Sequence, residues 1–338
     1  MTPYVRPVPV SASEDGDVTR LAGSETVRFT QVDVFDRGQT ATRQASDHLS
    51  AEASKRLSAL RADVCGLTFD QPRIMGILNV TPDSFSDGGT LSGIADAVTR
   101  AGAMAADVDI LDIGGESTRP GAAEVTGSEE IRRTAPVIRA IRDAGITTPI
   151  SIDTRKAAVA QAALDAGADM VNDVTALRFD RDMASVVAGA GVPVCLMHSV
   201  GTPETMQSQA NYDDVLCDVY DHLAERIDAA TSAGIARDSI IVDPGIGFGK
   251  TLQHNVTLLR GLAVYHSLGL PILLGASRKR FIGTLSGEDD AAQRVGGSLA
   301  VALHGAAQGV QILRVHDTKQ TRQALDLQLA LSGTQTYG

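Results

Sequence analysis

From residue 74 onward, short apolar segments alternate with longer segments of helical period. The apolar segments are 74–80, 109–115, 148–153, 169–174, 192–198, 239–245, 270–277 and 309–316. Each is mostly apolar, as expected for a strand buried on both faces of a parallel sheet. The helical period is clearest in 212–235, where apolar residues recur at steps of three and four. The pattern therefore predicts parallel strands joined by helical crossovers.

Eight strand–helix units in about 250 residues predict an α/β fold, the (β/α)8 TIM barrel, over residues 72–331. A doubly wound open sheet is the alternative, although such sheets seldom use eight evenly spaced units. Residues 1–71 form an N-terminal extension with an expected strand at 27–35 and an expected helix at 49–60. We interpret this extension as a small cap over the barrel, with a partner-binding appendage as the alternative. Residues 332–338 are a tail.

Polar or charged residues follow nearly every predicted strand, whereas polar side chains are scarce earlier in the same strands. Solvated loops explain part of this pattern but not that scarcity. In a barrel the carboxyl ends of all strands converge on one face, where the active site is built. The sequence therefore predicts one polar site, to which the strand ends contribute Asn79, Asp153, Asn172, Asp243, Lys279, Arg314 and His316.

Three of these residues suit a flat heterocycle. Asp153, Asn172 and Asp243 supply two carboxylates and one carboxamide, which accept from ring N–H and amine donors and, for the carboxamide, also donate. The alternative is that some of them cap the following helices, as Asn and Asp often do. Because all three residues lie on one predicted face, we favour a ligand-binding role for them over a capping role.

Arg314 and His316 alternate about Val315, so their side chains lie on the same side of the last strand. A guanidinium beside an imidazole is a receptor for phosphate. TIM barrels often bind phosphate at the loops after strands seven and eight. A single histidine at a strand end would more often be structural, but the paired arginine favours an anion site.

Composition narrows the class of partner. The chain has 338 residues, a net charge of −11, 43% hydrophobic residues and no tryptophan, so its core is aliphatic. An acidic surface argues against a nucleic-acid partner. Three widely spaced cysteines indicate neither a disulfide framework nor a zinc site. Because no signal pattern and no run of membrane-spanning length is found, we expect a cytoplasmic protein with no membrane partner.

The motif at 74–89, IMGILNVTPDSFSDGG, resembles the first signature of the dihydropteroate synthase family of pterin-binding TIM barrels. The loop at 114–122, GGESTRPGA, resembles the second substrate loop of that family, and the resemblance spans roughly residues 72–331. It implies condensation of (7,8-dihydropterin-6-yl)methyl diphosphate with 4-aminobenzoate, giving 7,8-dihydropteroate and pyrophosphate for folate biosynthesis. It also implies that 4-aminobenzoate mimics of the sulfonamide type are inhibitors.

The resemblance also implies a role for individual residues. Pyrophosphate binding and catalysis are assigned to Asn79, Thr118, Arg119, Arg314 and His316, and pterin binding to Asp153, Asn172, Met197, Asp243 and Lys279. Pro120, Phe248 and Ser277 are assigned to the 4-aminobenzoate side, and Lys250 is also expected near that side. Asn79 is also expected to contact a Mg²⁺ ion, which keeps several waters and takes phosphate oxygens as ligands.

Some features leave alternatives open. Asp83, Ser84 and Asp87 in the first loop are equally suited to forming turns. Ser199 and Val200 depart from the usual family pair, which puts the outer part of the fifth loop in doubt. The predicted helix at 289–309 is small or apolar on most sides, which favours a homodimer contact, in line with the family's habit of dimerising.

Two other functions remain as alternatives. A pterin-binding methyltransferase would have the same barrel and pterin slot, but it would not need the anion receptor of RVHD and STRPGA. A non-catalytic homologue would keep the fold as a binding module, which the intact set of site residues disfavours. Pyrophosphate release on mixing the two substrates would separate these functions.

Overall fold

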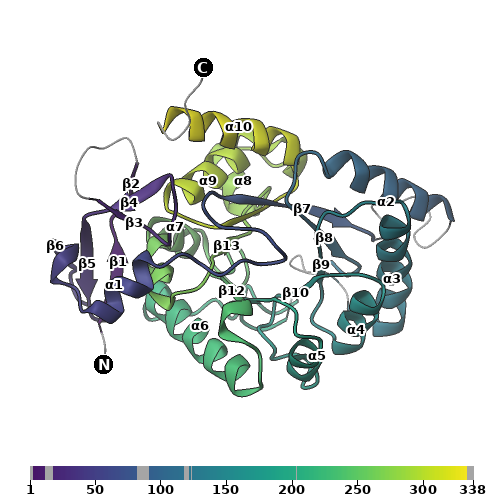
Figure 1. Cartoon of the computed structure of the whole chain (residues 1–338), viewed down its shortest axis with the longest axis horizontal. Helices are drawn as coiled ribbons and strands as arrows, with labels where there is room; N and C mark the ends of the chain where they lie inside the picture. Colours follow the sequence, from purple (N-terminus) through teal and green to yellow (C-terminus); the bar gives the residue numbers. More distant parts are fainter. Residues whose placement is uncertain are drawn as a thin grey trace.

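Eight parallel strands form a barrel at the centre of the molecule (Figure 1). The computed structural model describes residues 3–11, 18–81, 91–117, 122, 124–202 and 204–332. Neighbouring strands follow the order β12-β11-β10-β9-β8-β7-β14-β13, and a bridge between Val242 and Ile272 links the two ends. The strands are β7 (Arg73–Asn79), β8 (Ile110–Gly114), β9 (Ile150–Asp153), β10 (Met170–Asp173), β11 (Val194–Met197), β12 (Ile240–Asp243), β13 (Leu273–Leu274) and β14 (Ile312–Val315). The barrel is confirmed and the open sheet is excluded.

Helices surround the barrel (Figure 1). They are α2 (Leu91–Met104), α3 (Gly127–Asp143), α4 (Ala157–Asp165), α5 (Met183–Ala190), α6 (Val215–Ser232), α7 (Leu252–Arg260), α8 (Arg280–Ser286), α9 (Val295–Ala307) and α10 (Thr318–Leu331), with 3-10 turns η3 (Arg237–Ser239), η4 (Leu262–Leu268) and η5 (Ala291–Gln293). In α6 the Asp214 side chain accepts from the first-turn amides, and Val219, Leu223 and Ile227 are buried. Among the described helices, none is both long and apolar enough to cross a bilayer.

Alternation along the strands fills the barrel in layers. The lower layer is apolar and fully buried, and consists of Met75, Ile110, Met170, Cys195, Ile241, Leu273 and Ile312. Val64 and Phe69, from the segment that leads into β7, pack against this layer. Two residues further along, the side chains again point inward. They are polar on four strands, as Asp112, Asn172, Asp243 and Arg314, whereas Ile77 and Met197 remain apolar and Gly275 has no side chain. The apolar floor thus separates the polar mouth from the opposite end of the barrel.

Two predicted strands differ from the observed ones. The segment 270–277 keeps only Leu273–Leu274 as a strand, because Pro271 has no N–H and Arg278 turns the chain at a φ of +59°. The expected strand at 27–35 is divided into β4 (Val27–Phe29) and β5 (Gln31–Phe35). Thr30 separates them, and they belong to two different sheets.

The N-terminal extension lies at one side of the barrel (Figure 1). Its sheets have the orders β1-β5-β6 and β2-β4-β3, from β1 (Tyr4–Pro7), β2 (Val10–Ser11), β3 (Thr19–Arg20) and β6 (Thr42–Ala45), followed by η1 (Ser46–His48) and α1 (Ala51–Ser58). Leu21, Phe29 and Leu57 form part of a small separate core. The Tyr4 hydroxyl donates to Asp221 of α6 at 2.8 Å, and Arg37 pairs with the same carboxylate at 2.6 Å. These contacts fasten the extension to the outside of α6.

Gly76 is required by the close packing of β7 against the helices. A Cβ atom there would lie 2.6 Å from Met104 Cε, 2.7 Å from Val108 Cγ1 and 2.9 Å from Thr318 Cγ2. Val108 and Thr318 are β-branched and cannot easily change rotamer. We expect Gly76→Ala to lower the free energy of unfolding by about 1–3 kcal/mol in urea denaturation followed by circular dichroism.

The matched control is Gly189→Ala in α5, where an added Cβ meets nothing within 4 Å. That change should raise the free energy of unfolding by about 0.5–1 kcal/mol, because alanine loses less backbone entropy in a helix. Equal stability of the Gly76 variant and the natural protein would contradict the packing argument.

Candidate active site

One row of the sheet brings together three of the predicted site residues, with Gly114 between the first two. The strand register pairs Asn79 with Gly114, Gly114 with Asp153, and Asp153 with Asn172. Residues paired in a parallel sheet point to the same face, so Asn79, Asp153 and Asn172 all face into the barrel mouth. The sequence predicted these side chains to lie on one face, and the register shows why they do.

Glycines at two positions keep space open between the polar groups. A Cβ atom on Gly114 would lie 3.5 Å from Asn79 Oδ1 and 3.7 Å from Asp153 Oδ2. A Cβ atom on Gly275 would lie 3.7 Å from both Arg314 Cδ and Asp243 Oδ2. Side chains at these two positions would therefore occupy the mouth where the functional groups converge.

Arg314 joins two carboxylates across the mouth. Its Nε donates to Asp112 Oδ2 at 2.6 Å, and its Nη2 donates to Asp153 Oδ2 at 2.7 Å. Burial raises the pKa of Asp153 to about 7, against the opposite effect of Arg314. The second oxygens of both carboxylates are buried and make no hydrogen bond among the described residues. When both carboxylates are ionised, the single positive charge of Arg314 leaves this cluster with a net negative charge.

Lys279 and Asp243 form the opposite side of the mouth. Lys279 Nζ donates to the Ile246 carbonyl and lies 4.3 Å from the centre of the Phe248 ring. Burial lowers the pKa of Lys279 to about 7, and Asp243 acts in the opposite direction. Asp243 Oδ1 accepts from the Gly245 amide at 2.7 Å, which holds the loop after β12. The lysine is thus held by the loop that Asp243 anchors.

His316 and Ser277 meet between the last two strands. The His316 backbone amide donates to Ser277 Oγ at 3.2 Å, and its Nδ1 lies 3.1 Å from the same oxygen. Arg278 pairs with Asp317, and its amide donates to Ser298 Oγ at 2.9 Å. Ser277 is therefore engaged with His316, and Arg278 supports the ends of these strands. Together these contacts hold His316, Ser277 and Arg278 at the carboxyl ends of β13 and β14, next to Arg314 in the sequence.

Comparison with known proteins identifies the family. The family model described as "Pterin binding enzyme" matches residues 75–316. This chain belongs to the pterin-binding enzyme family. A relative in Escherichia coli strain K12, a dihydropteroate synthase, is 46% identical over 267 residues, which are 79% of this chain and 94% of the relative.

Solved structures of dihydropteroate synthases agree with this placement. The Xanthomonas albilineans enzyme with 4-aminobenzoic acid is 48% identical, with a TM-score of 0.74 over 80% of this chain and 97% of its own. The Yersinia pestis enzyme in a sulfonamide drug complex is 43% identical, with a TM-score of 0.76 over 81% and 100%. Both cover the barrel and leave part of this chain unmatched.

The sequence did not single out Asp112, which is fully buried and shares Arg314 with Asp153. Asp112 falls two residues after the inward-facing Ile110, in an otherwise apolar strand. An acidic residue at an inward position of a buried strand was therefore the available signal.

A second buried cluster lies behind the loop after β8. Lys156 Nζ bridges Glu116 at 2.9 Å and Glu130 at 2.7 Å, and Arg155 Nε donates to Glu116 at 3.2 Å. The Arg155 guanidinium also lies 4.0 Å from the centre of the Phe179 ring. Because the cluster joins β8, α3 and the start of α4, it fixes the base of the loop after β8.

Lys250 and His198 form a buried contact beside the loop after β12. Lys250 Nζ lies 2.9 Å from His198 Nδ1 and 3.0 Å from the Phe248 carbonyl oxygen, and both side chains are buried. Burial lowers the pKa of Lys250, against the opposite effect of Asp243. These contacts tie Lys250 to the Phe248 loop, and its place near 4-aminobenzoate stays a prediction.

Several predicted residues lie outside the described part of the chain: Thr118, Arg119, Pro120, Asp83, Ser84 and Asp87. Met197 ends β11 and is buried. Ser199 Oγ donates to the Val174 carbonyl at 2.7 Å, and a Cβ atom on Gly249 would come within 2.1 Å of Val200 Cγ2. The departure from the family pair therefore belongs to packing between the loops after β10, β11 and β12.

The raised pKa of Asp153 predicts a dependence of stability on pH. A carboxyl group whose pKa is raised on folding contributes stability at low pH that is lost as the pH rises through about 7. In Asp153→Asn this loss should be absent. Between pH 5 and pH 8 we expect the natural protein to lose about 2 kcal/mol of unfolding free energy relative to the variant, measured in urea.

Titrations common to both proteins cancel in this difference. Asp165→Asn, on the outer end of α4, is the matched control and should show no such divergence. A constant difference between Asp153→Asn and the natural protein across this pH range would show that Asp153 is ionised throughout.

Proposed function

We propose that this chain is a dihydropteroate synthase, which joins (7,8-dihydropterin-6-yl)methyl diphosphate to 4-aminobenzoate and releases pyrophosphate. The observation that carries the proposal is the polar barrel mouth, where Asp153, Asn172, Asp243 and Lys279 converge beside Arg314. This mouth belongs to a chain that is 46% identical to a dihydropteroate synthase over 267 aligned residues, which are 94% of that enzyme.

The pterin slot is proposed between Asp153, Asn172 and Asp243, with Met197 packing against the ring. A pterin presents ring N–H and amine donors on one edge and an oxo group on another. The buried oxygen of Asp153 that has no partner among the described residues suits a donor of this kind. Lys279 then donates to the oxo edge from its place beside the Phe248 ring. This assignment gives a pterin contact to every polar group that faces inward on the pterin side of the mouth.

Pyrophosphate is proposed to lie toward His316, Arg314 and Asn79, with Thr118 and Arg119 from the second loop. Support comes from the guanidinium of Arg314 at the mouth and from the space that Gly114 leaves beside Asn79. Although burial opposes it, pairing with Asp112 and Asp153 raises the pKa of Arg314, so its charge persists at every working pH. The 4-aminobenzoate is proposed to lie on the outer side, near Phe248, Ser277 and Pro120.

A Mg²⁺ ion fits this site only when the substrate diphosphate supplies some of its ligands. No cluster of three or more histidine, cysteine or acidic residues suited to a metal occurs among the described residues. The Asn79 carboxamide oxygen faces the open space at Gly114 and can supply one oxygen ligand. Bound there with the diphosphate, the ion would offset negative charge on the leaving group.

The proposed mechanism is a largely dissociative displacement. The bond between the pterin methylene carbon and the diphosphate oxygen breaks as the amine nitrogen approaches that carbon. Arg314 and His316 stabilise the departing pyrophosphate, while the carboxylates of Asp153 and Asp243 favour positive charge on the pterin. The aromatic amine is neutral at pH 7, so its attack requires no strong base in the site. The amine proton leaves after the carbon–nitrogen bond has formed.

Pyrophosphate release on mixing the two substrates tests this function directly. A dihydropteroate synthase forms one pyrophosphate for each dihydropteroate. A pterin-binding methyltransferase or a non-catalytic pterin binder would release none, and that result would overturn the proposal. The polar side chains that converge at the barrel mouth make a non-catalytic pterin binder the least supported of the three functions.

Lys279 provides the sharpest test of the pterin slot. Lys279→Met removes the cation at the pterin oxo edge and should lower kcat/KM for the dihydropterin diphosphate by about 100-fold or more. In the natural enzyme the alkaline limb of the kcat/KM profile should lie near pH 7, since the ammonium group is lost above its pKa of about 7.

Arg139→Gln, an exposed change on α3, serves as the control and should leave both parameters unchanged. Lys279→Arg should move the alkaline limb upward, because a guanidinium stays protonated. A profile that is the same in the natural enzyme and Lys279→Arg would exclude Lys279 as the titrating group.

A homodimer through α9 is also proposed. Gly296, Ala300 and Ala307 form a small exposed stripe on α9, and Leu285 of the neighbouring α8 is 63% exposed. The opposite face of α9 is buried against the barrel. A helix with small residues outward and an exposed leucine beside it suits close packing against a second copy.

Ala300→Arg should weaken this contact by placing a long charged side chain at its centre. We expect sedimentation velocity to show a dimer for the natural protein and a monomer for the variant at micromolar concentration. Arg139→Gln should sediment as the natural protein does, and a monomeric natural protein would rule out the α9 contact.

A further inference from the structure

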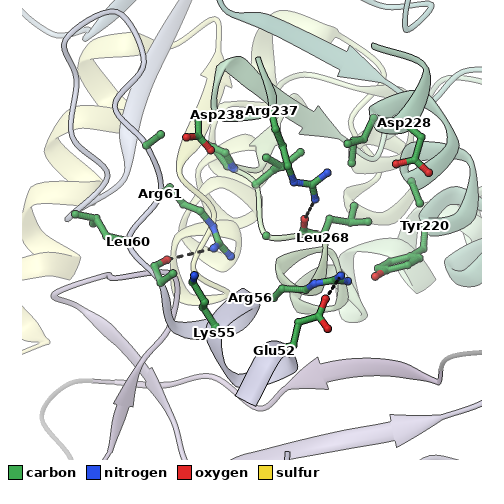
Figure 2. A pocket seen from close by; sticks show the side chains of 17 residues that line it. Glu52, Lys55, Arg56, Leu60, Arg61, Tyr220, Asp228, Arg237, Asp238 and Leu268 are labelled. Carbon is green, nitrogen blue, oxygen red and sulfur yellow. Dashed lines mark hydrogen bonds and ion pairs between the residues drawn. The ribbon is translucent and has the colours of Figure 1, made fainter. Parts of the chain in front are cut away.

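A cavity of about 570 Å³ lies between the N-terminal extension and the barrel (Figure 2). Its walls come from α1, from residues 59–62, from α6, from η3 and from residues 268–271. None of the residues assigned to the active site lines it. Its volume falls within the range of small-molecule sites, roughly 300–1,000 Å³. The cavity is therefore a separate place where a ligand of moderate size fits.

Arg61 is the unusual group in its wall. The side chain is only 3% exposed, yet its guanidinium has no carboxylate partner among the described residues. Its Nη1 donates to the Ala59 carbonyl at 3.2 Å and its Nη2 to the His266 carbonyl at 3.0 Å, while its Nε is buried without a partner. A buried cation without a counter-charge is unfavourable unless an anion compensates it.

Among the described residues, no carboxylate pairs with Arg61, and its neighbour His266 is uncharged. Burial alone lowers the pKa of Arg61 to about 10. His266, whose carbonyl accepts from Arg61, is buried, and burial together with Arg61 lowers its pKa to about 3, so it is neutral. His266 Nδ1 is likewise buried without a partner. The positive charge is thus retained on Arg61 beside an uncharged imidazole.

Other cations face the same cavity. Figure 2 shows Lys55, Arg56 and Arg61 directed toward its middle. Arg56 is paired with Glu52 at 2.6 Å, and Arg237 donates to the Leu268 carbonyl at 2.7 Å, whereas Lys55 has no partner among the described residues. Four cationic and three acidic side chains line the cavity. A local positive excess is notable in a chain of net charge −11.

The remaining wall is apolar. Leu60, Leu268, Leu270 and Ile227 line the cavity together with the ring of Tyr220. Leu60 is 61% exposed at its edge. A ligand in this cavity would therefore meet cations at one end and aliphatic and aromatic surface at the other.

We propose that this cavity binds a small organic oxyanion, a carboxylate or phosphate group on an apolar body, with the anionic group between Arg61 and Lys55. The apolar body would lie against Leu60, Leu268 and Tyr220. Because Lys55 and Arg61 belong to the extension and Arg237 to the barrel, the ligand would join the two parts. Its binding would stabilise their attachment without touching the barrel mouth.

The test uses the full-length protein labelled with 3-fluorotyrosine and followed by ¹⁹F NMR. Tyr220 lines the cavity, so its resonance, assigned with Tyr220→Phe, reports on this site and not on the barrel mouth. Phenyl phosphate and benzoate are titrated separately. A saturable shift of the Tyr220 resonance with either probe supports the proposal, and the probe with the lower Kd identifies the anionic group.

Variants establish that the cations hold the anion. Arg61→Gln should raise the Kd at least about tenfold, as expected for a buried charge-assisted hydrogen bond. Lys55→Met, at an exposed position without structural contacts, should raise it about threefold and leaves folding intact. The matched control Arg139→Gln should not change it.

Two results would overturn the proposal. One is the absence of any Tyr220 shift with both probes at about 10 mM, a concentration at which even weak sites of this kind fill. The other is a Kd that is the same in the natural protein, Lys55→Met and Arg61→Gln. Neither result tests the proposed function, because pyrophosphate release depends on the barrel mouth, at the opposite end of the barrel from this cavity.

Discussion

Closure of eight parallel strands into one barrel is the constraint on which the site depends. The parallel register places Asn79, Gly114, Asp153 and Asn172 in one inward-facing row, and the bridge between Val242 and Ile272 brings Asp243 to the facing side. In an open sheet these residues would be spread along one edge. The apolar floor below them holds the strands in this register, since a slip of one residue would turn the polar row toward the helices.

Burial then sets the chemistry of the mouth. Arg314 lies between Asp112 and Asp153, Lys279 lies near Asp243, and the pKa values of Asp153 and Lys279 are both moved to about 7. Each charge is held by partners in a medium where leaving it unpaired is costly. The unpartnered oxygens of Asp112 and Asp153 are the exception. Such unfavourable features commonly mark a functional site, where a ligand supplies the missing donors.

The N-terminal extension packs against the other end of the barrel and against its side. Val64 and Phe69 close the floor, while Tyr4 and Arg37 hold α6 from outside. Its sequence carries no motif of the pterin-binding family, and the family match begins at residue 75. The two ends of the barrel thus serve different purposes. One end carries the polar residues at the carboxyl ends of the strands, and the other carries the attachment surface that contains Arg61.

The sequence by itself determined the eight strand–helix units, the face on which polar residues gather and the family, because periodicity and the motif at 74–89 are local properties of the chain. It also located Asp153, Asn172, Asp243, Lys279, Arg314 and His316 at strand ends. It did not reveal that Asp112 shares Arg314, that Lys250 contacts His198, or that 27–35 divides between two sheets. Those outcomes depend on contacts between residues as many as 202 positions apart, which only the closed tertiary structure brings together.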